Sequence, residues 1–503
     1  MATSLTTGRP WRVILLFTLP LMIGNVVQQL YHFADTVVVG RLLGVDALAA
    51  VGATGSLLFL LLGFAWGLTS GFAIPTAQAY GARDAAAVRR SVATGAVLSG
   101  ITTVLLTVAA PLLAEPALVA LRTPPELLAD ATVFTQISFL GAGALMFFNF
   151  LSAVIRAIGD SRTPLIFLVI SCALNVVLVV AAIAWLGFGV AGAALATVIA
   201  QAVSVLLCLE FVRRRIPELH LHRDDWRITR ADLALHLRLG LPMGFQASII
   251  AIGALIVQVA LNSLGSDAVA AYTAASRVDG LAVALLQSMS LAVSMYVAQN
   301  YGAGRPDRIR SGVVQAAWIA VIAAVALGVL LISLGGPIVR IFLGDGADEV
   351  VDLAVSMLVI NGVSYTALGV LFVTRGALQG LGSTVIPTVT GVVELVARGA
   401  AAVGLGAAMG FVGVAWSNPL AWFGAAVILI PAYLVAHRRL ATMPSAPMTV
   451  TPTTPIAVIG PIDGSMSVET VVTQPVRLPA RPSRVRRALR GRRTDRRRLA
   501  RKG

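Results

Sequence analysis

One acidic side chain lies inside a long apolar segment near the start of the chain. Residues 28–40 read QQLYHFADTVVVG, and Asp35 lies within a hydrophobic stretch from about Val13 to Val39. An aspartate at the centre of a membrane helix costs about 2.5–3.5 kcal/mol on insertion scales. Such a carboxyl has two common uses: a structural hydrogen bond or cap at the membrane edge, and the carriage of a proton or cation. Asp35 is therefore the first candidate for chemistry.

Other charged or titratable residues lie within apolar segments. His32 precedes Asp35 by three positions, so the two can share a helix face, although a packed histidine is the simpler interpretation. Glu394 and Arg398 are four positions apart, a spacing that suits an intrahelical ion pair. Glu394 is also a candidate for attracting a cationic substrate.

Arg277 and Asp279 lie well inside a third apolar segment. Charges at such a depth are expected to face a water-filled interior or to pair with another helix. We treat both residues as a candidate site for substrate or protons. Arg156 and Arg375 end two apolar segments, where a snorkelling side chain is the default interpretation.

The elements that position these residues are apolar segments long enough to cross a bilayer. The chain has 503 residues, of which 57% are hydrophobic and 12% charged, and about 20 apolar residues span the hydrocarbon core. Backbone groups in lipid need internal partners, so the sequence predicts an all-α polytopic membrane protein. We predict 12 transmembrane helices at about 13–40, 46–79, 91–113, 128–157, 163–187, 190–212, 239–263, 268–300, 311–334, 350–380, 385–408 and 410–436.

Charges alternate between the connections, and this predicts the orientation. One set of connections is rich in arginine: Arg9, Arg12, Arg83, Arg89, Arg90, Arg213, Arg214, Arg215, Arg223, Arg227, Arg230, Arg238, Arg305, Arg308, Arg310, Arg438 and Arg439. The other set is rich in acids: Asp46, Glu115, Glu126, Asp130, Asp267, Asp345, Asp348 and Glu349, beside Arg41, Arg122 and Arg340. The positive-inside rule places the first set in the cytoplasm. We expect a multi-pass protein of the bacterial plasma (inner) membrane, with both termini cytoplasmic and no cleaved signal peptide.

The net charge of +15 is concentrated at the end of the chain. Residues 475–503 carry twelve Arg and one Lys against Asp495, a net charge of +12. The stretch PSAPMTVTPTTP precedes them, so we predict a disordered cytoplasmic tail over 438–503. Its arginines are candidates for contact with anionic lipid headgroups. Nonspecific contact with RNA is a weaker alternative, and we expect no specific nucleic-acid partner.

The chain contains an internal repeat. LGVDALAAV (43–51) returns as LGSDAVAAY (264–272), and AQAYGARD (77–84) returns as AQNYGAGRPD (298–307), both offset by 221 positions. The repeat predicts a cytoplasmic N-terminus (1–12), an N-lobe (13–212), a cytoplasmic linker (213–238) and a C-lobe (239–437). Six helices per lobe give both lobes the same orientation, with substrate between them. Pro20 and Pro242 occupy matching places in the two lobes and are predicted to kink their helices.

These motifs, in order and duplicated, resemble those of multidrug and toxic compound extrusion (MATE) transporters. The resemblance covers about residues 13–437 and includes the GD-x-R-x-P turn, GVAGAALAT, GLPMGFQA and VAQNYGAGR. It implies a V-shaped pair of six-helix lobes that alternate access and expel cationic or amphipathic compounds. It also implies drive by an inward H⁺ or Na⁺ gradient, with no other cofactor and no metal site. We expect a monomer.

The resemblance also implies a cation site. The NorM-like layout, with acids on the seventh and tenth helices, is absent, because the seventh has no acid and the tenth has only Asp352 at its edge. The DinF-like layout finds Asp35, Asn175 and Thr197 in matching places, but Val179 replaces its second acid. A lone carboxyl in apolar surroundings favours H⁺ over Na⁺ as the coupling ion. The candidate supporting residues are Asn25, Gln28 and His32, and the candidate C-lobe substrate or charge site comprises Gln246, Arg277, Asp279, Glu394 and Arg398.

Other functions fit the sequence less well. A lipid-linked saccharide flippase has a related architecture but needs a cationic central cavity, and intramembrane arginine is sparse. A major-facilitator transporter usually shows a G-x-x-x-D-R-x-G-R-like loop, which YGARDAAAVRRS does not match. An intramembrane enzyme needs converging catalytic groups, and the sequence has no H-E-x-x-H, G-x-S-x-G or paired-aspartate motif. The flippase stays the alternative, with an enzyme or a channel more remote.

Overall fold

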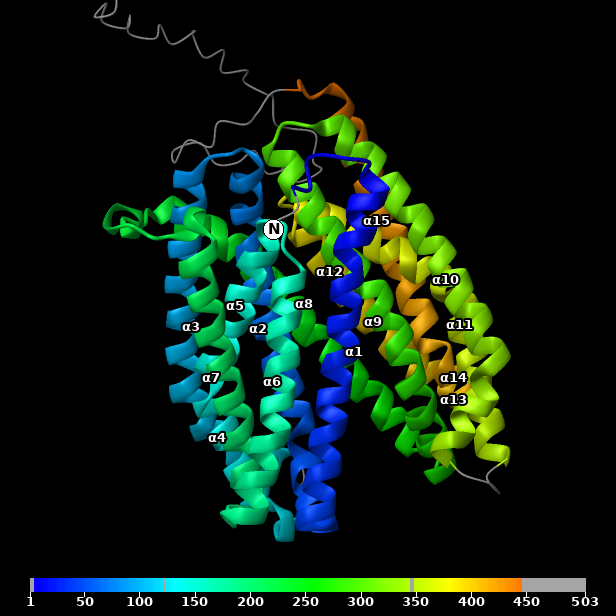
Figure 1. Cartoon of the computed structure of the whole chain (residues 1–503). Coiled ribbons are helices and arrows are strands. Elements are labelled where there is room, and N and C mark those ends of the chain that lie inside the picture. Colours follow the sequence, from blue (N-terminus) through cyan, green and yellow to red (C-terminus); the bar gives the residue numbers. More distant parts are fainter. Residues whose placement is uncertain (1–3, 122, 344–347, 446–503) are drawn as a thin grey trace, which may run out of the picture. The chain divides into compact units, whose positions relative to one another are not determined.

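The computed structural model describes residues 4–121, 123–343 and 348–445, and these residues form helices and short connections without a strand (Figure 1). All the helices belong to one compact unit, Met1–Ile459. The predicted tail, apart from residues 438–445, lies outside the described residues, as do Arg122 and Asp345 of the connections.

The first half of the chain contains seven α-helices and three short helical turns. The α-helices are α1 (Pro10–Leu43), α2 (Val45–Gly81), α3 (Ala85–Ala120), α4 (Pro125–Leu140), α5 (Ala142–Ala157), α6 (Arg162–Val180) and α7 (Gly189–Arg215). The turns are η1 (Ala181–Trp185), a π-helix, and η2 (Pro217–Leu219) and η3 (Arg223–Trp226) in the linker.

The second half contains the remaining helices. These are α8 (Arg230–Asn262), α9 (Ser266–Gly302), α10 (Pro306–Leu343), α11 (Asp348–Gly380), α12 (Val385–Ala400), the π-helix η4 (Ala401–Leu405), α13 (Gly406–Met409), α14 (Phe411–Ala415) and α15 (Ser417–Thr442). The two π-helices fall in matching places of the two repeats, in the fifth and the eleventh span.

The helices account for the predicted membrane spans. Within the described residues, eleven spans are long and apolar enough to cross a membrane, and α4 and α5 together supply a twelfth. The fourth predicted span, 128–157, is therefore present but bent by 46° at Gly141. The prediction of an all-helical protein with twelve spans is confirmed, while the division into lobes at 213–238 stays a prediction.

The two prolines predicted to kink their helices both lie in continuous helices. Pro20 is inside α1 and Pro242 is inside α8. Pro242 has no N–H to donate to the carbonyl of Arg238. The hydroxyl of Thr384 donates to that carbonyl instead, at 3.0 Å. The backbone group freed by the proline is thus satisfied by the side chain of the residue that precedes α12.

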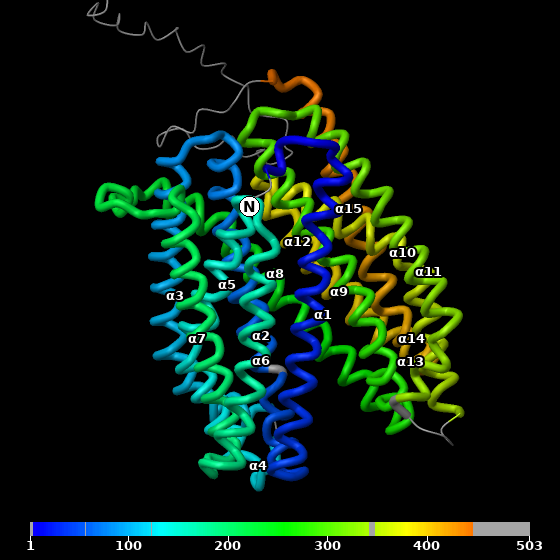
Figure 2. Tube along the Cα trace, viewed as in Figure 1, coloured from blue at the N-terminus to red at the C-terminus, as the bar shows by residue number. Residues whose placement is uncertain are grey.

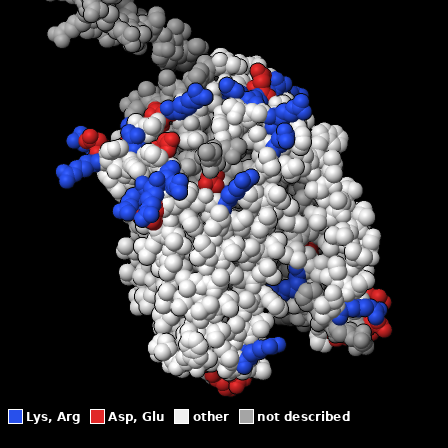
Figure 3. Space-filling model, in the orientation of Figure 1, with Lys and Arg blue, Asp and Glu red and all other residues white. Residues whose placement is uncertain are grey.

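The two halves of the chain meet at the arginine-rich end. Figure 3 shows most of the basic side chains at this end. The end of α9, from Ala292 to Gly302, is buried at every residue, and α2 is buried almost continuously from Ala65 to Ala79. The trace in Figure 2 shows α1 running between α6 and α9, and it packs on both.

Hydrogen bonds between the halves follow the repeat. Gln78 Nε2 donates to the carbonyl of Gly380 at 3.1 Å, and its equivalent Gln299 donates to the carbonyl of Ala157 at 2.7 Å. Of the hydrogen bonds that α1 makes to the second half, those of Asn25 lie farthest from the start of the helix. Its Nδ2 donates to the carbonyl of Ala284 and to the hydroxyl of Ser288 on α9, at 3.1 and 2.9 Å. Within the described residues, no hydrogen bond between the halves lies beyond Asn25 toward the acid-rich end. The described conformation is therefore closed at the arginine-rich end.

Candidate cation-coupling site

Two of the predicted site residues meet directly where α6 packs on α7. Asn175 is fully buried on α6, and its Nδ2 donates to Thr197 Oγ1 of α7 at 3.1 Å. Thr197 in turn donates to the carbonyl of Ala193 one turn earlier at 3.2 Å. The Asn175 Oδ1 atom is buried and has no hydrogen-bond partner.

The third helix at the site is α1, in the half that lies away from the arginine-rich end. Tyr31 and Asp35 are four residues apart, which places them on one face of the helix. Tyr31 lies within electrostatic range of Asp35 and near the Thr197 hydroxyl, without a well-formed hydrogen bond to it. Both the Tyr31 hydroxyl and the Asp35 Oδ1 atom are buried and unpartnered.

This arrangement leaves three buried oxygen atoms without a partner, from Tyr31, Asp35 and Asn175. Most buried polar atoms in proteins have a hydrogen bond, so such a set calls for an explanation. A proton on Asp35 supplies a donor that neighbouring oxygens can accept, whereas Na⁺ would use the oxygens as ligands.

Asp35 is the lone carboxylate of this cluster within the described residues. Val179, which replaces the family's second acid, is completely buried in an apolar cluster with Val39 and Ile183. A bound proton neutralises one carboxylate completely, and a bare Na⁺ ion favours more oxygen ligands and charge compensation.

The three candidate supporting residues lie elsewhere. Asn25 is engaged with α9, as described above. Gln28 is exposed and makes no hydrogen bond within the described residues. His32 is also exposed, and its ring meets the Tyr31 ring edge-on at a centroid distance of 5.4 Å. Asn25 is thus engaged with another helix, and His32 contacts the site through the ring of Tyr31.

The two candidate charged residues on α9, Arg277 and Asp279, lie in different surroundings. Arg277 is exposed. Asp279 is buried and accepts hydrogen bonds from the Tyr365 hydroxyl at 2.6 Å and from Asn361 Nδ2 at 3.0 Å, both on α11. Arg277 and Asp279 consequently do not form one site in this conformation, and Asp279 links α9 to α11.

The remaining candidates are buried in the second half of the chain. Glu394 of α12 pairs with Arg375 of α11, and not with Arg398 on its own helix as its spacing suggested. Arg398 is buried beside Gly253 of α8, with its Nε atom unpartnered. Gln246 accepts a hydrogen bond from Gln379 Nε2 at 3.2 Å. These contacts join α8, α11 and α12, and the three predicted side chains Gln246, Glu394 and Arg398 are buried.

The sequence analysis did not select two residues that contact the candidate site residues, Tyr31 and Arg375. A signal for Tyr31 was available, because it lies one helical turn before Asp35 in YHFAD. Arg375 was interpreted as a snorkelling residue at a helix end. Its buried position beside Glu394 depends on the packing of α11 against α12, which periodicity along one helix does not reveal.

The fold and the site define a class: a two-repeat, twelve-span membrane transporter with an intramembrane carboxyl. A family model described as MatE matches residues 20–181 and 242–402, one segment in each half. The chain belongs to the MATE family of transporters. The match covers both repeats and explains their order, so the family resemblance is confirmed.

Individual relatives agree with this assignment. The probable multidrug resistance protein YoeA of Bacillus subtilis (strain 168) is 30% identical over 386 residues, which are 75% of this chain and 83% of the relative. The probable multidrug resistance protein YpnP of the same organism is 28% identical over 384 residues, 76% of this chain and 85% of the relative. Similarity to transporters of this kind also shows that the chain is not an enzyme.

Solved structures share the fold. The crystal structure of MATE in complex with MaL6 superposes with a TM-score of 0.82 at 24% identity, covering 88% of this chain and 99% of the other. A multidrug resistance MATE family transporter of the MOP superfamily, in an outward-facing conformation, gives a TM-score of 0.80 at 24% identity, with 88% and 100% covered.

Proposed function

We propose that this chain is a secondary active multidrug or metabolite exporter that expels cationic or amphipathic small molecules in exchange for H⁺. The observation that carries the proposal is the set of three buried, unpartnered oxygens of Tyr31, Asp35 and Asn175. Relatives with multidrug resistance names support the substrate class.

We assign the coupling step to Asp35, with Asn175, Thr197 and Tyr31 as its surroundings, in the DinF-like layout. Asp35 lies 23 residues beyond Arg12 in α1, about 35 Å at 1.5 Å per residue. If the arginine-rich end faces the cytoplasm, as the positive-inside rule predicts, Asp35 receives protons from the outer side. The protein then lies in the bacterial inner membrane with both termini in the cytoplasm.

The closed arginine-rich end supports alternating access. In this orientation the described conformation is shut toward the cytoplasm, and its hydrogen bonds between the halves stop at Asn25. Protonation of Asp35 from outside would remove its charge and let it share a hydrogen bond with the open acceptors of the cluster. We propose that α1 then packs more closely against α6 and α7, and that this change opens the arginine-rich end.

The test is efflux from liposomes. Purified protein is reconstituted, a fluorescent cation is loaded, and its efflux is followed under an imposed pH gradient without Na⁺. Wild type is compared with Asp35→Asn, and with Asp46→Asn as a control, because Asp46 is an exposed acid at the start of α2. Folding and insertion are checked for all three.

We expect efflux by wild type and by Asp46→Asn, and a loss of more than tenfold in Asp35→Asn. Equal efflux by Asp35→Asn would show that the carboxyl is structural and would direct attention to Asp279 and Glu394. Efflux that begins only when Na⁺ is added would overturn the assignment of H⁺ as the coupling ion.

A further inference from the structure

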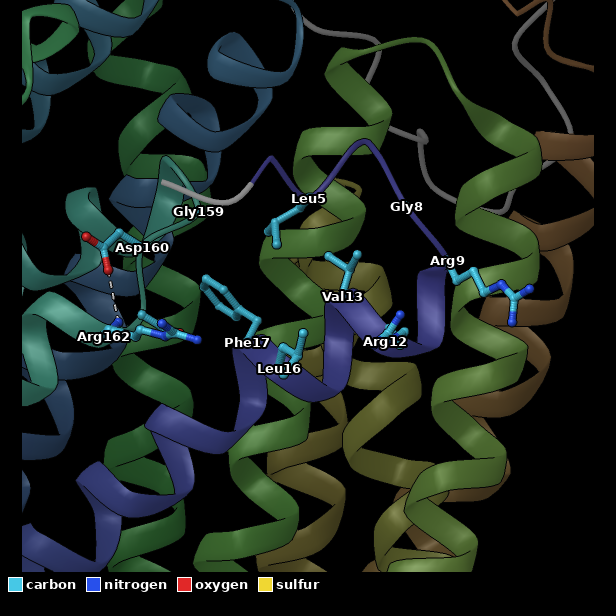
Figure 4. Close-up of a pocket in the computed structure, with 11 residues that line it drawn as sticks. Leu5, Gly8, Arg9, Arg12, Val13, Leu16, Phe17, Gly159, Asp160 and Arg162 are labelled. Carbon is cyan, nitrogen blue, oxygen red and sulfur yellow. Dashed lines mark hydrogen bonds between the residues drawn. The ribbon is translucent and has the colours of Figure 1, made fainter. Parts of the chain in front are cut away.

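A separate pocket lies at the arginine-rich end, between the start of α1 and the connection from α5 to α6 (Figure 4). Its volume is about 430 Å³. The residues that give it chemical character are Arg9, Arg12, Leu16, Phe17, Asp160 and Arg162. None of these residues belongs to the cluster around Asp35, so the proposed function does not use this pocket.

The pocket has an excess of positive charge. Arg9, Arg12 and Arg162 are exposed, and none of their guanidinium groups has an ion pair or hydrogen bond within the described residues. The carboxylate of Asp160 is occupied: it accepts from the backbone N–H groups of Arg162 and Thr163, both at 3.0 Å, and from the Thr163 hydroxyl at 2.7 Å. In Figure 4 this carboxylate points away from α1, whereas the Arg162 side chain extends toward it.

The floor of the pocket is apolar and continues onto the outer surface of the helices. Leu16 and Phe17 line it, and Leu16 and Leu19 are exposed on α1. Ile166 and Ile170 are exposed on α6, which packs against α1. A ligand here therefore meets guanidinium groups in the pocket and exposed apolar side chains on the neighbouring turns of α1 and α6.

One wall of the pocket is held by hydrogen bonds to the second half of the protein. The segment that precedes α1 is fastened to the second half: Leu5 N–H donates to Gln299 Oε1 at 3.2 Å, and Arg308 Nη1 donates to the carbonyl of Gly8 at 2.8 Å. The opposite wall, Gly159 to Arg162, belongs to the first half. A ligand bound across the pocket would hold together the end that is closed in this conformation.

We propose that the pocket binds the headgroup of an anionic phospholipid from the leaflet on the arginine-rich side. Arginine recognises phosphate oxygens through paired N–H donors, and Arg12 and Arg162 present two free guanidinium groups from opposite walls. The acyl chains lie along Leu16, Leu19 and Ile166, where they are in their normal hydrocarbon surroundings. Anionic lipids are attracted to basic groups at this depth.

Thermal unfolding in mixed micelles tests the proposal. The full chain is melted with added phosphatidylglycerol, with phosphatidylcholine of the same acyl chains, and with inorganic phosphate alone. The test variant is Arg12→Gln/Arg162→Gln. Its matched control is Arg230→Gln/Arg238→Gln, which removes two exposed guanidinium groups of α8 at the same end of the molecule.

We expect phosphatidylglycerol, and neither other addition, to raise the melting temperature of wild type. The rise should fall by half or more in the test variant and persist in the control. A similar reduction in both variants would overturn the proposal in favour of general surface charge. A rise produced equally by inorganic phosphate would overturn it in favour of a free-anion site.

A second variant covers the case in which the double glutamine variant does not fold. Arg12→Lys/Arg162→Lys keeps the charge but loses the paired donors. Native mass spectrometry should show fewer retained phosphatidylglycerol molecules on this variant than on wild type, and unchanged retention would overturn the proposal. Asp35→Asn should retain the lipid normally, so this result is separable from the test of transport.

Discussion

At the scale of single residues, Tyr31 adds a hydroxyl to a site that the sequence described with three residues. Its oxygen is buried and unpartnered next to Asp35 and Thr197. Tyr31→Phe removes that oxygen and keeps the ring. If this hydroxyl hydrogen-bonds to Asp35 during the coupling step, the loss of that bond, about 1 kcal/mol, should slow H⁺-driven efflux about fivefold without unfolding the protein.

The control is Tyr433→Phe, whose hydroxyl lies 3.5 Å from His437 on α15, in the other half of the chain. Initial efflux rates in liposomes measure the difference. If Tyr31→Phe and Tyr433→Phe both transport at the wild-type rate, the Tyr31 hydroxyl takes no part in coupling.

A second residue-scale prediction concerns the linker. Asp225 accepts from Arg89 Nε at 3.1 Å and from the His222 N–H at 2.7 Å. Burial opposes the charged form, but the His222 N–H and the Arg89 charge outweigh it and hold the pKa of Asp225 below its usual value. A lowered pKa means that the folded state binds fewer protons than the unfolded chain. The stabilisation is therefore complete above the unfolded pKa of about 4 and is lost as pH falls through the folded value.

Asp225→Asn should consequently lower the melting temperature by a few degrees at pH 7, and the difference from wild type should shrink as pH falls below about 4. Thermal unfolding in detergent across this range measures it. The neighbouring Asp224→Asn is the control, because Asp224 is highly exposed and its contact with Arg227 spans 3.6 Å. A pH-independent difference for Asp225→Asn would contradict the assigned cause.

Among the predicted site residues, one contact in the first half of the chain is present, and one pairing expected in the second half is not. Asp35, Asn175 and Thr197 were placed by motif order, and the structure joins Asn175 to Thr197 directly. Spacing along one helix suggested that Glu394 pairs with Arg398. The observed partner, Arg375, comes from another helix, and contacts between helices depend on packing that a single sequence does not encode locally.

At the scale of helices, length and hydropathy were sufficient for the twelve spans but not for the bend between α4 and α5. The apolar run is continuous through Gly141, so no local breaker was visible. The reason lies on α7: a Cβ atom at residue 141 would come within 2.1 Å of Val198 Cγ2. The bend thus occurs where a helix from elsewhere in the chain approaches the backbone.

The crossing of α2 and α9 gives the prediction at this scale. A Cβ atom on Gly81 would lie 1.9 Å from the carbonyl oxygen of Gln299, and one on Gly302 would lie 1.8 Å from that of Gln78. These atoms belong to backbone and move only with their helices. Gly81→Ala should therefore force the helices apart, lower the melting temperature and reduce efflux more than tenfold.

Gly52→Ala is the matched control on the same helix, because a Cβ atom there meets nothing within 4 Å. Both variants are compared by thermal unfolding and by liposome efflux. Wild-type behaviour of Gly81→Ala would mean that α2 and α9 do not approach so closely in the working transporter.

At the scale of the whole molecule, the repeat explains how one end is closed. Gln78 and Gln299 are equivalent positions, and each donates across the boundary to equivalent carbonyls, those of Gly380 and Ala157. Each half thereby contributes the same contact to the other. Gln299 Oε1 also accepts from the Leu5 N–H of the first half, so the closure should depend on both glutamines, and more strongly on Gln299.

We therefore predict that Gln78→Ala and Gln299→Ala each shift the population toward a conformation open at the arginine-rich end, and that the double variant shifts it further. Each hydrogen bond contributes about 1 kcal/mol, so Gln78→Ala should alter the ratio of closed to open molecules about fivefold, and Gln299→Ala, which removes two such bonds, should alter it by more. Spin labels at Ala86→Cys and Asp307→Cys, exposed at the starts of α3 and α10, report the distance by electron paramagnetic resonance in a Cys172→Ser/Cys208→Ser background. Gln28→Ala, which removes an exposed side chain, should leave the distance distribution unchanged. A strong effect of one glutamine and none of the other would show that the two halves close by different means, despite their matching sequences.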